Sequence, residues 1–166
     1  MSRLTIRDAC PDDLGRIVAI YNASIPGRLA TADPDPVSVE QRRPWLRDRD
    51  CSRRPVWVAE RDGDVAGWLS VGDFYGRPAY HATAEVGVYV DPAHRRQGVA
   101  GALLDHLVQR APELGLRRLL AVVFAHNEAS LALFERAGFE RWGLLPQVAE
   151  LDGRLIDSAI LGRRVD

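Results

Sequence analysis

The sequence predicts one α/β domain, in which a mixed sheet is flanked by helices. Segments with the two-residue period of strands alternate along the chain with segments that have the 3.6-residue period of helices. The 166 residues, 46% of them apolar and 27% charged, suit a single core of ordinary globular composition. Neither an internal repeat nor a long polar linker divides them. Residues 1–166 are therefore expected to fold as one domain.

The first quarter of the chain is predicted to form a strand and two helices. Residues 4–7 alternate apolar and polar side chains, which is the pattern of a short strand. Pro11, a residue tolerated in the first turn, marks a helix that runs to about Asn22. The proline-rich residues 24–38 predict a loop, and a weakly patterned second helix follows over 39–49.

Three strands are predicted in the middle of the chain. The first two span 56–60 and 65–71, and the Asp62–Gly63 pair between them is a strong hairpin signal. Residues 72–82 are rich in glycine, proline and aromatic side chains, so a loop is expected there. The β-branched run 85–90 predicts the third strand, which an Asp-Pro pair ends.

The second half alternates helices and strands. Apolar residues at helical spacing predict a helix from Val99 to near Gly115. The continuous apolar run 119–124 predicts a strand buried on both faces. A helix capped by an asparagine at 127 and stopped by a glycine at 138 comes next. The last two strands are expected at 139–145 and 155–161, joined by a second Asp-Gly turn.

The composition excludes several classes of chemistry. The 22 basic residues are all arginine, so a lysine-dependent phosphate loop and a lysine Schiff base are both excluded. The near balance with 23 acidic residues gives no electrostatic reason to expect nucleic acid or membrane partners. Cys10 and Cys51 form no Cys-x-x-Cys pair, and no metal-ligand motif occurs. With no secretory or membrane-spanning pattern, we expect a cytoplasmic protein without a metal.

The segment after the third middle strand has the features of an anion site. It opens directly into an amphipathic helix, whose first N–H groups have no partner within the helix and can bind a pyrophosphate. Gly98 would let the main chain approach phosphates closely, and two arginines add positive charge. The alternative is an ordinary strand-to-helix turn with solvated arginines. The candidate residues are Arg95, Arg96, Gln97, Gly98, Val99, Ala100 and Gly101.

The spacing Arg95-x-x-Gly98-x-Ala100 resembles the acyl-CoA pyrophosphate loop of the GCN5-related N-acetyltransferases (GNAT), with the pattern Gln/Arg-x-x-Gly-x-Gly/Ala. A second signature of that family follows as Asn127-x-x-Ser130 and the FERAGF run that ends at Phe139. Within the family the chain most resembles phosphinothricin and methionine-sulfoximine acetyltransferases. The supporting stretches are Ile20-Tyr21-Asn22, Gly72-Asp73-Phe74, Glu85-x-x-Val88-Tyr89-Val90 and Leu145-Pro146-Gln147-Val148.

The resemblance implies a mostly antiparallel sheet of six or seven strands, about four helices, and a splayed strand pair at the acetyl-CoA site. There Val88, Tyr89 and Val90 would bind the pantetheine arm through the main chain, and the 95–101 segment the pyrophosphate. Asn127 and Ser130 would contact the acetyl-CoA arm. Their simpler roles are a helix cap and a small polar helix residue.

Glu85 is the candidate catalytic base. A lysine-like ammonium must lose a proton before it attacks a thioester, at a cost of about 4.6 kcal/mol at pH 7. Glu85 is a carboxylate at the head of an otherwise apolar strand, where the family places a glutamate; the alternative is an exposed residue at the strand mouth. Phe134 stands where relatives often have a tyrosine or histidine acid, so that group is missing. His81 and His126 are the candidates nearest in sequence.

The predicted acceptor side consists of an aromatic loop together with the start of the splayed strand. Its residues are Phe74, Tyr75, Gly76, Arg77, Glu85, Val86 and Gly87, with Tyr80 nearby. A hydrophobic mini-core beneath the loop is the alternative for the aromatic rings.

The function expected is direct acetyl transfer to the primary amine of a small molecule, such as an amino acid or an antimetabolite like phosphinothricin. A protein acetyltransferase and a non-catalytic acyl-CoA-binding module are the alternatives. The resemblance also implies a homodimer.

Overall fold

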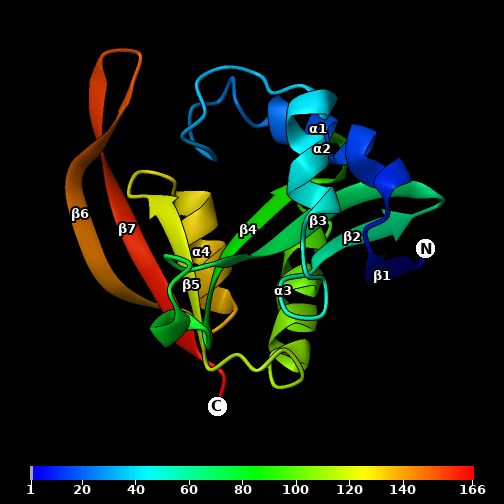
Figure 1. Ribbon diagram of the computed structural model, residues 1–166. Coiled ribbons are helices and arrows are strands. Elements are labelled where there is room, and N and C mark those ends of the chain that lie inside the picture. The colour runs from blue at the N-terminus through cyan, green and yellow to red at the C-terminus, as the bar shows by residue number, and fades with distance from the viewer. Residues whose placement is uncertain (1) are drawn as a thin grey trace.

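The computed structural model describes residues 2–166, in which seven strands form one sheet with the order β1-β2-β3-β4-β5-β7-β6 (Figure 1). Every neighbouring pair is antiparallel except β4 and β5, which are parallel. The strands are β1 Leu4–Asp8, β2 Val56–Arg61, β3 Asp64–Asp73, β4 Thr83–Val90, β5 Arg118–Phe124, β6 Glu140–Leu151 and β7 Arg154–Arg164. The predicted mixed, mostly antiparallel sheet is confirmed.

Helices cover both faces of the sheet. They are α1 Leu14–Ala23, α2 Val39–Arg47, α3 Val99–Arg110 and α4 Glu128–Arg136, with short 3₁₀ turns at Pro11–Asp13, Pro78–Tyr80 and Pro92–His94. The predicted order of elements is confirmed, and several elements differ from the prediction in length. The third helix ends at Arg110 rather than near residue 115, because Pro112 has no N–H to continue the ladder. The last two strands extend beyond their predicted ends.

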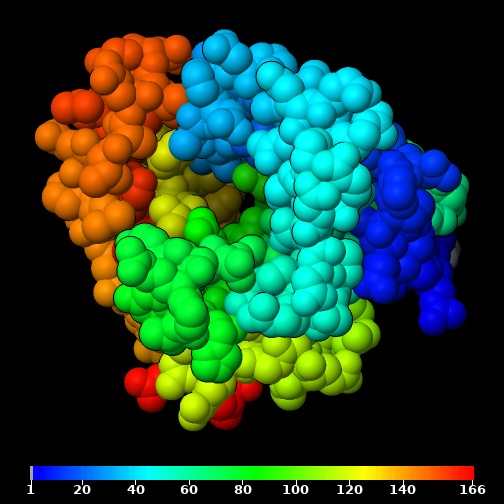
Figure 2. Space-filling model, viewed as in Figure 1, coloured from blue at the N-terminus to red at the C-terminus, as the bar shows by residue number. Residues whose placement is uncertain are grey.

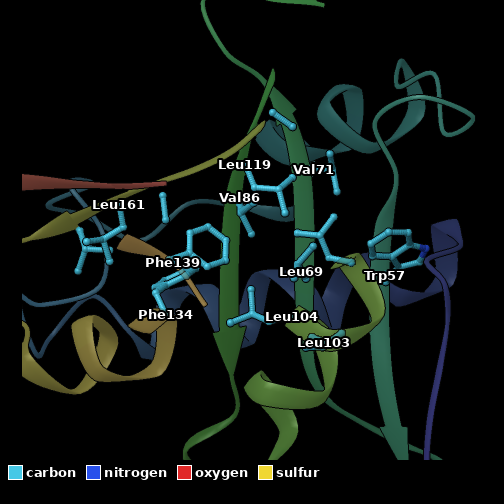
Figure 3. Close-up of a cluster of buried hydrophobic side chains, with 14 of the residues drawn as sticks. Trp57, Leu69, Val71, Val86, Leu103, Leu104, Leu119, Phe134, Phe139 and Leu161 are labelled. Carbon is cyan, nitrogen blue, oxygen red and sulfur yellow. The ribbon is translucent and has the colours of Figure 1, made fainter. Parts of the chain in front are cut away.

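Alternation along the strands divides the core between the two faces. On the α3 and α4 face, Leu69, Val86, Leu104 and Phe134 belong to one large buried cluster (Figure 3). On the α1 and α2 face, a second cluster contains Trp68 and its neighbours from the helices. Side chains next to each other along β3 and β4 therefore point to opposite faces.

Both hairpin turns adopt the geometry that the Asp-Gly pairs predict. Asp62 and Gly63 have φ values of 54° and 80°, and Asp152 and Gly153 have 53° and 74°. Two successive left-handed residues define a type I′ turn, which matches the twist of the flanking strands.

The parallel strands β4 and β5 separate after three paired positions, Thr83, Ala84 and Glu85. Beyond Glu85, β4 stays paired with β3 as far as Val90, and β5 stays paired with β7 as far as Phe124. The edge of β4 that faces β5 is therefore open over residues 86–90. This is the predicted splayed strand pair.

The separation also corrects one prediction. The strand at 119–124 is not buried on both faces, because the side chain of Val122 is 47% exposed. Val122 lies two residues past Leu120, the last residue of β5 that pairs with β4. The side chain is left uncovered because the sheet opens at that point.

Candidate active site

The face of the molecule that bears α1 and α2 is hollowed near its centre (Figure 2). Blue atoms of residues 24–38, green atoms and yellow atoms surround the hollow. We call residues 24–38 the front loop and residues 74–82, between β3 and β4, the aromatic loop. The hollow lies on the α1 and α2 face of the sheet. Alternate side chains of β4 point to this face.

Glu85 points to this face. Tyr89, four residues further along β4, packs with the α1 and α2 cluster, so Glu85 and Gly87 share its face by alternation. Glu85 is exposed, and it forms no salt bridge with any described residue. Because Glu85 pairs with Leu120, Leu120 and Val122 of β5 face the same way. The carboxylate therefore lies at the edge of an apolar floor.

Val86 does not line this face. Its side chain is 6% exposed and belongs to the core on the α3 and α4 side (Figure 3). The sequence predicts Val86 on the acceptor side, but the alternation of β4 turns that side chain into the core instead. Only the main-chain atoms of Val86 remain available at the open edge.

Aromatic rings form one wall of the site. Tyr89 stacks on Trp68 with ring centroids 4.8 Å apart, and its ring meets that of Tyr21 edge-on at 5.1 Å. Burial raises the pKa of the Tyr89 hydroxyl above its usual range, and burial also raises the pKa of Tyr21. The Tyr21 hydroxyl contacts Thr31 Oγ1 at 2.6 Å and donates to Asp33 in the front loop. Both phenols therefore stay neutral across the physiological pH range.

The loop between β4 and α3, residues 91–98, is here called the entry loop. Arg96 and Gly98 have left-handed φ values of 59° and 79°, and Gly98 is the N-cap of α3. The first main-chain bond into the helix runs from the N–H of Ala102 to the carbonyl of Gly98. The N–H groups of Val99, Ala100 and Gly101 point out from the helix start, as an anion site requires.

Two contacts fix the entry loop from outside. Arg16 of α1 donates to Asp91 at 2.6 Å, and this hydrogen bond lowers the pKa of the Asp91 carboxyl. Arg61 donates to Gln97 Oε1 at 2.6 Å. The Gln97 side chain is thus bound to β2, and its Nε2 donates to the carbonyl of Ala93 at 3.3 Å.

Charge is available beside the helix start. Arg95 and Arg96 are exposed, and neither pairs with a carboxylate of residues 2–166. The side chain of Val99, by contrast, is 2% exposed in the core and offers only its N–H. Free guanidinium groups and outward N–H groups therefore occupy the same end of α3.

Asn127 is a helix cap that also holds the front loop. Its Oδ1 accepts the N–H of Ser130 at 3.2 Å, which confirms the cap. Its Nδ2 donates to Ser130 Oγ at 3.0 Å and to the carbonyl of Leu29 at 3.1 Å. Both amide hydrogens are therefore engaged within the protein, and Oδ1 keeps one acceptor position for a ligand.

The front loop is held at two further places. Asn22 exchanges two hydrogen bonds with the main chain of Val37, at 2.8 Å and 2.9 Å. Arg28 donates to Asp152, in the turn between β6 and β7, at 3.0 Å. These contacts and the bond to Leu29 join segments that are distant in sequence around the hollow.

The aromatic loop presents its rings to solvent. Phe74 lies 4.3 Å from the Tyr75 ring and 5.5 Å from the Tyr80 ring, centroid to centroid. Tyr75 is 75% exposed and has a φ of 59°, and Gly76 follows with 63°. The rings contact one another but form no buried mini-core. A cavity of about 450 Å³ here is lined by Arg53, Asp73, Phe74, Gly76, Arg77, Pro78, Tyr80 and His81.

The two candidate histidines contact residues outside β4. Phe134 is 4% exposed and packs edge-on against Phe139. His126 is exposed and stacks on Phe124, whereas His81 Nδ1 lies 2.9 Å from the carbonyl of Pro78 in the aromatic loop.

The structure brings Glu85, Gly87 and Tyr89 to one face of the open strand. The sequence pattern missed Val122, the Tyr21–Asp33 contact and the bond from Asn127 to the front loop. Only the register of β4 against β5 shows that Val122 faces the hollow, and no local signal marks it. No helix of residues 2–166 combines the length and apolarity needed to span a membrane. The same residues contain no cluster of three or more metal-ligating side chains.

Comparison with known proteins agrees with this geometry. Residues 17–139 match the family described as "Acetyltransferase (GNAT) family". YwnH of Bacillus subtilis, provisionally assigned as a phosphinothricin acetyltransferase, is 49% identical over 163 residues, covering 98% of this chain and 99% of that protein. The L-methionine sulfoximine/L-methionine sulfone acetyltransferase of Pseudomonas aeruginosa is 35% identical over 98% of this chain and 95% of its own length.

A solved structure with a bound ligand has the same fold. The phosphinothricin acetyltransferase of Sinorhizobium meliloti, in complex with acetyl-CoA, superposes with a TM-score of 0.88. It is 33% identical, and the match covers 97% of this chain and 88% of that one.

The split sheet, the exposed start of α3 and these matches together define an acetyltransferase. The chain belongs to the acetyltransferase (GNAT) family. The resemblance predicted from its motifs is confirmed, as is the fold class.

Proposed function

We propose that this enzyme moves the acetyl group of acetyl-CoA to the primary amine of a small, amino-acid-like acceptor. One observation carries the proposal: the open edge of β4 joins the anion-binding start of α3 on one side and faces Glu85 and the hollow on the other. The names of the relatives support an acceptor of this size and class.

The residues present fit acetyl-CoA as the second substrate. N–H groups at the start of α3 and the guanidinium groups of Arg95 and Arg96 suit its pyrophosphate. Unpaired main-chain groups of residues 88–90 suit the two amides of the pantetheine arm, as an added strand would. Bound there, acetyl-CoA supplies an activated thioester.

Glu85 is proposed to accept the proton of the acceptor's ammonium group, directly or through water. The neutral amine then forms a bond to the acetyl carbon while the bond from that carbon to sulfur breaks. The N–H of Val88 or Tyr89 at the open edge would stabilise negative charge developing on the carbonyl oxygen. The nitrogen loses its second proton as the amide forms. Since Phe134 has no proton to give, coenzyme A leaves as a thiolate, which that proton or one from water can protonate.

The aromatic loop is proposed to bind the body of the acceptor. Phe74, Tyr75 and Tyr80 offer apolar surface, and the exposed guanidinium of Arg77 offers a partner for an acceptor carboxylate. Phosphinothricin and methionine sulfoximine, which name the acceptors of the relatives, both fit this chemistry. Either compound is therefore a first substrate to test.

The test is thiol release from acetyl-CoA with a panel of acceptors, namely methionine sulfoximine, methionine sulfone, phosphinothricin, the common amino acids and a set of N-terminal peptides. We expect acceptor-dependent release with at least one small amine. Release with peptides alone would favour a protein acetyltransferase. Calorimetric binding of acetyl-CoA with no turnover on any acceptor would favour a non-catalytic module.

We also propose a cytoplasmic homodimer. Apolar side chains of β6 lie on the surface, with Leu144 50% and Val148 58% exposed, which supports an interface on this outer strand. Both cysteines are free thiols, which suits a reducing compartment. Light scattering after size exclusion tests the dimer, for which the expected mass is twice 18.4 kDa, and cell fractionation tests the location.

A further inference from the structure

Arg54, which belongs to none of the motifs above, is the most buried arginine near the aromatic loop. It is 6% exposed and lies between α2 and β2, directly before Pro55. A charged side chain so far removed from water must be compensated by hydrogen bonds, or it would destabilise the fold. The partners of Arg54 therefore show which part of the molecule it holds.

The guanidinium of Arg54 bonds to both stems of the aromatic loop. Its Nε donates to Asp73 Oδ1 at 2.7 Å, at the end of β3. Its Nη2 donates to the carbonyl of His81 at 2.9 Å, just before β4. One rigid, planar fork thus joins the residue before the loop to the residue near its end.

A second arginine holds Arg54 itself. Arg49 donates from Nε to the carbonyl of Arg54 at 2.9 Å and from Nη2 to the carbonyl of Val71 in β3. The main chain at Arg54 is therefore tied to the same strand that leads into the loop. This second contact makes Arg54 a fixed support rather than a flexible surface side chain.

The aromatic loop needs such a support. Tyr75 and Gly76 are both left-handed, a conformation that is unfavourable for tyrosine, and the Tyr75 ring is largely in solvent. Contacts among exposed rings do little to set the loop's position. The stems then determine where the loop and its cavity lie, and Arg54 connects them.

The contacts of Arg54 also fix the strand position next to Glu85, the proposed catalytic base. Asp73 pairs with Ala84 across β3 and β4, and Glu85 is the next residue. We infer that Arg54 is a positioning residue, which sets the aromatic loop and the start of β4 relative to each other so that an acceptor can reach Glu85. The inference rests on the function proposed above.

The experiment compares Arg54→Lys and Arg54→Met with Arg7→Met as the matched control. Arg7 also bonds a carboxylate, that of Asp13 at 2.8 Å, but it does so on β1, away from the loop. For each variant, the KM for the acceptor, the KM for acetyl-CoA and kcat are measured with the best acceptor from the panel. Hydrogen–deuterium exchange of residues 74–82 is followed in parallel without substrate.

We expect Arg54→Met to lower kcat/KM for the acceptor by about 10²-fold, the loss that a displaced binding element produces, while the KM for acetyl-CoA stays within about twofold. Exchange should rise in residues 74–82. A lysine cannot span both stems, so Arg54→Lys should fall between Arg54→Met and the wild type. Arg7→Met should leave both KM values and loop exchange unchanged even if it lowers Tm.

Other outcomes overturn the inference. An unchanged kcat/KM for the acceptor, or KM values that rise equally for both substrates, would make Arg54 a residue of general stability only. If Arg54→Met does not fold, Arg54→Lys decides alone: wild-type acceptor kinetics and wild-type exchange in 74–82 would refute the two-stem role. A wild-type enzyme with no turnover on any small amine would instead refute the proposed function. The exchange measurement would still show whether Arg54 holds residues 74–82 in place.

Discussion

The two sides of the open β4 strand are built in different ways. The proposed acetyl-CoA side, residues 86–101, is one continuous segment that offers mainly main-chain groups. The proposed acceptor side brings together side chains from the front loop, the aromatic loop, β4 and β5, and contacts such as Asn127 to Leu29 join residues 98 positions apart. Main-chain recognition leaves a short motif in the sequence, whereas recognition by side chains from distant segments leaves none.

The largest expected effect is on the acetyl-CoA side, from Gly98→Glu. A carboxylate within about 4 Å of the pyrophosphate would cost about 4 kcal/mol at an effective dielectric of 20, or about 10³-fold in affinity. Calorimetry should detect no acetyl-CoA binding at concentrations that saturate the wild type.

Gly115→Glu is the control for that variant. Gly115 also has a left-handed φ, 69°, and an added Cβ would meet nothing within 4 Å, as at Gly98. The two variants therefore share the same backbone strain, but Gly115 lies past the other end of α3. Its acetyl-CoA affinity should match the wild type. Normal affinity in Gly98→Glu would show that the start of α3 does not hold the pyrophosphate.

The next largest effect is expected at the point where the two sides meet, from Glu85→Gln. The amide keeps the size of the side chain but cannot take a proton, so kcat should fall by about 10²-fold or more, with the KM for acetyl-CoA unchanged. Glu140→Gln, on exposed β6, is the control. Equal kcat values for Glu85→Gln and wild type from pH 6 to pH 9 would remove Glu85 from the mechanism.

The contrast between the two sides explains what could be predicted from sequence. The strand and helix order, the Asp-Gly turns and the entry loop depend on neighbours in the chain, so their patterns are local. The exposure of Val122 and the orientation of Val86 depend on where β4 leaves β5, which is a property of pairing. The burial of Arg54 depends on carbonyl groups 27 residues away, and no sequence period reports such a contact.

Asp91→Asn tests how firmly the entry loop is held. Asparagine can still accept the N–H of Ala93 but loses the charged partner of Arg16, so the unfolding free energy at pH 7 should drop by about 1 kcal/mol. The Arg16 hydrogen bond lowers the pKa of Asp91 in the folded state from 3.8, so this stabilisation is complete above pH 3.8.

The difference between wild type and Asp91→Asn should therefore shrink as the pH falls below 3.8 and through the lowered pKa of the folded state. Denaturant unfolding at pH 7, 5, 4 and 3 measures it. A difference that stays constant down to pH 3 would mean that the charge of Asp91 does not stabilise the fold. In the same variant the KM for acetyl-CoA should rise more than that for the acceptor.

The smallest effect tests the boundary between the two sides, since Asn127 could serve either. Asn127→Asp keeps the cap on the N–H of Ser130 but loses the donor to Leu29, whereas Asn127→Ala loses both. Alanine should lower stability by about 1 kcal/mol, and aspartate also destabilises, because its second oxygen faces the carbonyl of Leu29 with no proton to donate. If Asn127 contributes to catalysis by holding the front loop, Asn127→Asp should raise the KM for the acceptor several-fold and leave the KM for acetyl-CoA unchanged. The opposite result, a rise for acetyl-CoA only, would move Asn127 to the acetyl-CoA side, where the free acceptor position of its Oδ1 can bind the pantetheine arm.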